Sequence, residues 1–78
     1  MTRTIEELDH RESNGISVSL LWNRRTNELT VRVEDSAEHE GFELDCGAHE
    51  ALDVFRHPYA YAAIRPVRDR RPTTVAQI

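Results

Sequence analysis

The chain has 78 residues, a net charge of −4 and a hydrophobic content of 38%, which indicates one small polar domain with little room for a core. It contains no run of about 18 apolar residues, so the composition excludes a membrane-spanning helix. The start, MTRTIEELDHRES, lacks the apolar block of a secretory signal, and we therefore expect a cytoplasmic protein. The single cysteine excludes an internal disulfide.

Charge is unevenly distributed along the chain. Residues 1–64 contain six Arg and 13 acidic residues, a net charge of −7, whereas residues 65–78 contain four Arg and one acidic residue, a net charge of +3. An acidic body with a basic end suggests that the end folds back on the body or meets an acidic partner. We expect residues 65–78 to form a flexible Arg-rich tail and residues 1–14 to form a flexible N-terminal arm that a turn at Asn14-Gly15 closes.

Two alternating segments follow the arm. Residues 16–22 place Ile, Val, Leu and Trp on one face and Ser17, Ser19 and Leu21 on the other, and residues 28–34 alternate again after a polar break. A period of two is typical of a half-buried strand, and the short break predicts an antiparallel hairpin. Residues 42–46 alternate as a third, shorter strand, which sequential pairing places beside the second.

Helical spacing then replaces the alternation. An apolar stripe is predicted at Ala48, Ala51, Leu52, Phe55 and Tyr59. Pro58 ends or kinks this helix near Arg56, or else opens a second short helix. Residues 15–64 therefore predict an α+β domain, in which a three-stranded antiparallel β-meander carries one amphipathic helix packed on one face (β-β-β-α).

The first strand of this meander lies at an edge of the predicted sheet. The outer face of that strand (Ser17, Ser19 and Leu21) carries no charge, and the strand has no Pro, so the usual protection of an edge is missing. We expect this edge to pair with a second copy or with another protein, unless the N-terminal arm covers it. A small core without a disulfide also favours a homodimer.

The segment HPYAYAA at residues 57–63 is the second predicted contact surface. Tyrosines are enriched in interfaces, and small neighbours allow close approach. Tyr59, Tyr61 and Ile64 therefore form a candidate partner-docking segment. The alternative is that Tyr59 completes the helix stripe and Tyr61 covers the end of the sheet.

Candidate catalytic and metal-binding residues are few. His49, Asp53 and His57 follow a spacing of four on the helix, with Cys46 three residues before them, but no established zinc spacing is present, and a solvated helix face is the preferred interpretation. Cys46 with His49 could act as nucleophile and base, but the alternation places Cys46 in the core. We expect neither a metal, nor another cofactor, nor an enzyme.

Four arginines of the tail (Arg65, Arg68, Arg70 and Arg71) are the candidate contacts to nucleic acid, through phosphates. The open face of the predicted sheet has no aromatic residue for stacking and carries several acids, so it does not fit RNA. Because the body is acidic, we expect a protein partner rather than nucleic acid.

The segments LLW (20–22), VRVED (31–35), FEL (42–44) and ALDVFRHPYAYAA (51–63) resemble short uncharacterised proteins typical of GC-rich actinobacteria, a resemblance that implies no activity. The β-β-β-α order is similar to that of small antitoxin domains of the HicB type, in architecture alone. The sequence thus predicts a non-enzymatic protein-interaction or regulatory module that self-associates and binds a partner. A nucleic-acid-associated regulator is the alternative, and a small metal-binding protein or enzyme is a more distant one.

Overall fold

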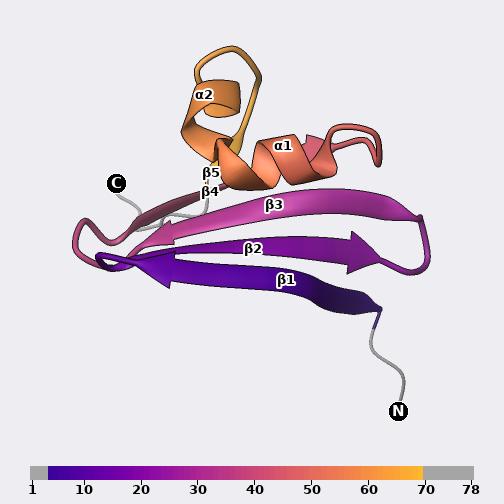
Figure 1. Ribbon diagram of the computed structural model, residues 1–78, viewed down its shortest axis with the longest axis horizontal. Helices are drawn as coiled ribbons and strands as arrows, with labels where there is room; N and C mark the ends of the chain where they lie inside the picture. Colours follow the sequence, from indigo (N-terminus) through magenta and orange to yellow (C-terminus); the bar gives the residue numbers. More distant parts are fainter. Residues whose placement is uncertain (1–3, 70–78) are drawn as a thin grey trace, which may run out of the picture.

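The computed structural model describes residues 4–69. It contains one antiparallel sheet in the order β1-β2-β3-β4-β5, so every strand lies beside its neighbour in sequence. The strands are β1 (Ile5–Ser13), β2 (Ile16–Asn23), β3 (Glu28–Asp35), β4 (Glu40–Cys46) and β5 (Arg68–Asp69). Two short helices, α1 (Ala51–Arg56) and α2 (Pro58–Ala62), lie on one face of the sheet, and within the described residues the opposite face carries no second layer (Figure 1).

The α+β class, the meander and the hairpin of β2 and β3 are confirmed, but the number of strands was too low. Strand β1 occupies residues predicted to be a flexible arm. Asn14 and Gly15 both have positive φ angles, 53° and 81°, as a two-residue hairpin turn requires. Ser13 therefore pairs with Ile16, and the chain before the turn runs back along β2.

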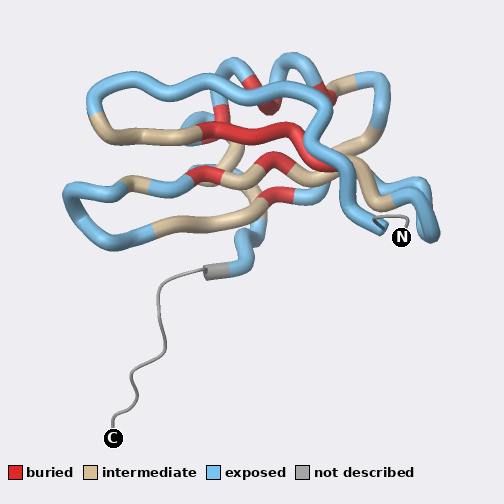
Figure 2. The backbone as a smooth tube through the Cα atoms, turned by 90° about the horizontal axis from the view of Figure 1, so that it is seen from below, coloured by how far each residue is buried: buried red, intermediate tan, exposed pale blue. Residues whose placement is uncertain are grey.

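This pairing overturns the interpretation of β2 as an open edge. The strand at this edge of the sheet is β1, next to β2, and all nine of its residues are exposed (Figure 2). Acidic residues at Glu6, Glu7, Asp9 and Glu12, together with an irregularity in pairing between Glu7 and Asp9, are the usual means by which a sheet edge is protected from pairing with another chain.

The core lies between the helices and the three central strands, where the buried segments in Figure 2 gather. Side chains of β2, β3 and β4 meet the buried side of α1. The buried residues of this cluster are Val18, Leu20, Val31, Val33, Leu44, Ala51, Val54 and Phe55. Cys46 and Tyr61 are partly buried against the cluster, as the alternation predicted for Cys46.

The single predicted helix is two helices, and its apolar stripe is shifted. The buried side of α1 consists of Ala51 and Phe55, as predicted, and of Val54, which was not predicted, and Pro58 of α2 extends it. Leu52, predicted to be in the core, is 58% exposed. The break at His57 follows from Pro58, which disfavours helical backbone at the preceding residue and suits the first position of the next helix.

Candidate binding groove

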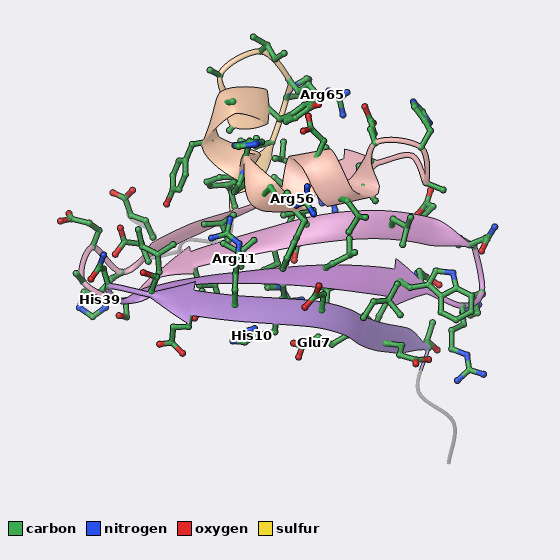
Figure 3. All side chains as sticks on the ribbon, in the orientation of Figure 1. Glu7, His10, Arg11, His39, Arg56 and Arg65 are labelled. Atoms are coloured by element: carbon green, nitrogen blue, oxygen red, sulfur yellow. The ribbon has the colours of Figure 1, made fainter. Side chains whose placement is uncertain are left out.

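Arg11 connects the edge strand to the junction of the two helices. It pairs with Val18 and so lies on the helix side of the sheet, where Figure 3 shows it pointing toward Arg56, while His10 and Glu7 point to the opposite face. Its Nη2 donates to the carbonyl oxygens of Phe55 at 2.9 Å and Arg56 at 3.2 Å. A cation is favourable at these last carbonyls of a helix.

The Arg11 guanidinium also covers the Phe55 ring, with its Cζ 5.4 Å from the ring centroid. Contacts of this kind between Arg and an aromatic face are attractive. The two hydrogen bonds and the ring contact together hold the Arg11 side chain in one place between β1 and α1.

Beside Arg11, a groove of about 420 Å³ lies between the β1–β2 hairpin and the α1–α2 junction. Its volume falls in the range of about 300–1,000 Å³ that is usual for ligand sites. The lining combines basic groups with polar and apolar surface. It consists of Arg11, Ser13, Asn14, Ile16, Val18, Arg56, His57, Pro58, Tyr59 and Ala60.

The charge of this groove is opposite to that of the rest of the protein. No carboxylate is among its lining residues, whereas each of four other hollows on the described surface is lined by at least two. Residues 4–69 contain seven Arg and 14 acidic residues, a net charge of −7. The groove is therefore a basic site on an acidic body.

Both Arg56 and Arg11 have guanidinium N–H groups that make no hydrogen bond to the described residues. Arg56 is exposed, and within residues 4–69 its side chain makes no hydrogen bond or ion pair. Arg11 uses only Nη2 for its bonds to the described residues. A guanidinium presents five N–H donors in a fork that matches a carboxylate. Both arginines can therefore donate hydrogen bonds to an anionic ligand while the Arg11 bonds to the helix carbonyls stay in place.

The candidate partner-docking segment has its three residues, Tyr59, Tyr61 and Ile64, in different environments. Tyr59 is 52% exposed, lines the groove and lies edge-on against Phe42, with 5.4 Å between ring centroids. Burial raises the pKa of the Tyr59 hydroxyl, and Asp35 and Glu40 add to the rise, so the hydroxyl stays a hydrogen-bond donor. Tyr61 donates to Asp53, and Ile64 is exposed but does not line the groove.

The predicted contact residues on β2 lie on the face of the sheet away from the helices. Ser19 and Leu21 are buried there, and Ser17 is partly buried. The Ser19 hydroxyl lies 3.0 Å from Nδ1 of His10 on β1. These residues are therefore in the interior of the sheet rather than at an accessible edge.

Two arginines of the predicted tail contact the body. Arg65 donates two hydrogen bonds to the Glu50 carboxylate, and Arg68 bonds with both Glu43 and Asp45. The Arg68 hydrogen bond holds the pKa of Asp45 below its usual value. Both arginines are therefore paired with carboxylates. Arg70 and Arg71 lie outside the described residues.

The candidate metal ligands are not brought together. Within residues 4–69, no group of three or more His, Cys, Asp or Glu side chains is placed to hold a metal ion. Asp53 accepts the Tyr61 hydrogen bond, and Cys46 lies with its Sγ 3.8 Å from the Leu29 carbonyl oxygen. Burial raises the pKa of the Cys46 thiol, and the charge of Glu50 raises it further, which is the reverse of what an activated nucleophile needs.

We expect Cys46 to react slowly with a thiol reagent such as dithionitrobenzoate, because a raised pKa and partial burial both reduce the accessible thiolate. The measurement compares the rate for the folded protein with the rate for the same protein in guanidinium chloride. A folded-state rate equal to the unfolded-state rate would show that the thiol is neither buried nor shifted.

Through its carboxylate, Glu50 makes the stability of the fold depend on pH in the acidic range. Hydrogen bonds from Arg65 and from the Gly47 amide lower its pKa from 4.5 to about 2. The carboxylate therefore stabilises the fold fully above pH 4.5, and its contribution is lost as the pH falls toward about 2.

Replacing Glu50 with Gln should lower the thermal unfolding midpoint at neutral pH, and the difference from wild type should shrink as the pH falls through that range. Glu38→Gln, in the exposed β3–β4 loop, is the matched control. A Glu50→Gln difference that does not change with pH would contradict the role of the ion pair.

No protein-family model, curated protein or solved structure shows significant similarity to this chain. Among residues 4–69, neither helix has the length and apolar character needed to cross a bilayer. The functional interpretation therefore depends on the groove itself.

Proposed function

We propose that the protein is a non-enzymatic protein-interaction module and that its binding surface is the groove at the α1–α2 junction. The observation that carries this proposal is the placement of unpaired arginine donors beside exposed apolar surface in a hollow whose lining includes no carboxylate. Arg and Tyr are, with Trp, the residues most enriched among those that dominate binding energy at protein interfaces.

A direct connection between the two walls of the groove supports the proposal. One wall is the β1–β2 hairpin and the other is the helix junction, and Arg11 bonds across the two. A surface that is ordered before binding loses less conformational entropy when the partner arrives. Self-association through the edge of β2 is not part of the proposal, because β1 occupies that edge.

The test is affinity purification from the organism that produces the protein, with wild type, Ala60→Trp and Ala37→Trp as baits. Ala60 lines the groove, and Ala37 is exposed in the β3–β4 loop, so the two variants add the same bulk at different places. We expect Ala60→Trp to lose the binding partner of the wild type and Ala37→Trp to keep it. Equal recovery with all three baits would contradict the groove as the binding surface.

A further inference from the structure

We propose that the groove binds a short acidic segment of its protein partner, in which one or two carboxylates lie next to an apolar side chain. This inference rests on the proposed function and specifies the chemistry of the partner. It follows from the charge of the groove, from the apolar part of its lining and from the charge of the surrounding body.

The carboxylate requirement comes from the two arginines. Arg56 is exposed at the end of α1, and Arg11 is held by the Phe55 and Arg56 carbonyls with further donors directed to no other described residue. Arg–carboxylate pairs often form two parallel hydrogen bonds. Because Arg11 is already fixed, pairing with it costs little side-chain entropy.

The apolar requirement comes from other residues of the lining. Ala60 and the partly buried Ile16 present hydrocarbon surface, and the exposed Tyr59 adds an aromatic ring. A carboxylate alone would leave this surface in contact with water. A neighbouring apolar side chain would bury it and so contribute the hydrophobic part of the binding energy.

The acidic body argues against nucleic acid as the ligand. The described residues carry a net charge of −7, and this charge repels a polyanion that extends beyond the groove. A phosphate backbone also offers no apolar side chain for the hydrocarbon part of the lining. A short protein segment with one or two carboxylates satisfies both parts of the groove with less repulsion.

The experiment titrates the isotope-labelled full chain with short capped peptides and follows the backbone amide resonances by NMR. The probe alternates Glu and Leu, and its matched controls alternate Gln and Leu or Lys and Leu. We expect the Glu–Leu peptide to shift the resonances of Arg11 and of residues 56–60. It should bind about tenfold more tightly than the Gln–Leu peptide and weaken as salt is added.

Two charge-reversal variants locate the contact. Arg56→Glu should weaken Glu–Leu binding about tenfold or more, whereas Arg25→Glu, at the exposed β2–β3 turn, should leave it unchanged. Arg56→Gln removes the charge without adding a negative one at the end of α1, and it should weaken binding in the same direction. A circular dichroism spectrum like that of wild type shows that each variant is folded.

Several results would overturn the inference. These are equal binding of the Glu–Leu and Gln–Leu peptides, shifts confined to the uncovered face of the sheet, or no effect of either Arg56 variant. Tighter binding of a single-stranded oligothymidylate at the same residues would assign the groove to nucleic acid. An oligomer in light scattering that Arg56→Glu dissociates would assign it to a second copy of the chain.

Failure of this inference is distinguishable from failure of the proposed function. If no peptide binds but Ala60→Trp still loses the natural partner, the groove is the binding surface and the acidic chemistry is wrong. If Ala60→Trp keeps the partner, the groove is not the binding surface and the proposed function fails.

Discussion

Replacing Leu44 with Ala is expected to lower the free energy of unfolding by about 2–5 kcal/mol. Leu44 is 1% exposed and lies in β4 within the core beneath the helices. A small domain has few other contacts to compensate for the cavity. Urea unfolding followed by the fluorescence of Trp22 or by circular dichroism measures the effect.

The matched control is Leu52→Ala, the same chemical change at a side chain that is 58% exposed. It should change the free energy of unfolding by no more than about 0.5 kcal/mol, since it empties no cavity and Ala is a strong helix former. A large loss at Leu52 with a small loss at Leu44 would mean that the helices pack on the sheet through a different face.

Removing residues 1–13 is expected to have the second large effect. The shortened chain loses β1 and with it the cover of the β2 edge, where Ser17, Ser19 and Leu21 carry no charge. An unprotected edge of this kind pairs with other chains. We expect size-exclusion chromatography with light scattering to show larger species than for the full chain at the same concentration.

The truncated chain should also be less stable, because it lacks the Arg11 hydrogen bonds to the end of α1. A truncated chain with the same molar mass per particle and the same unfolding midpoint as the full chain would contradict the role of β1. Arg11→Gln separates the two effects, since it removes the charged contact and leaves the edge covered.

The strands β2, β3 and β4 could be predicted because each lies under the helices and alternates apolar and polar residues. Strand β1 could not be predicted in the same way. The helices do not cover the edge, so its positions on the helix side are Glu6, Asp9 and Arg11 rather than apolar residues. The available signal was Asn14-Gly15, a pair that favours a tight hairpin as well as the end of an arm.

The predicted apolar face of the helix was wrong at Leu52. Helical periodicity places Ala51 and Phe55 on one face, as predicted, and either Leu52 or Val54 fits beside them. The structure buries Val54 and exposes Leu52. The break at Pro58 was predictable because it follows from the covalent geometry of proline.

The candidate groove was visible in the sequence only at Tyr59 and at the His57–Pro58 break. Its arginines come from β1 and from the end of α1, and the bond from Arg11 to the Arg56 carbonyl spans 45 positions in sequence. No local pattern links residues so far apart. Only the pairing of β1 with β2 brings Arg11 to the helix junction.

The most direct test of the binding groove is photo-cross-linking in the native organism, with p-benzoylphenylalanine in place of Ala60. The same substitution at Ala37, in the exposed β3–β4 loop, is the control. We predict a discrete cross-linked product with a partner protein from position 60 and none from position 37. The same product from both positions, or from position 37 alone, would contradict the groove at the α1–α2 junction as the binding surface.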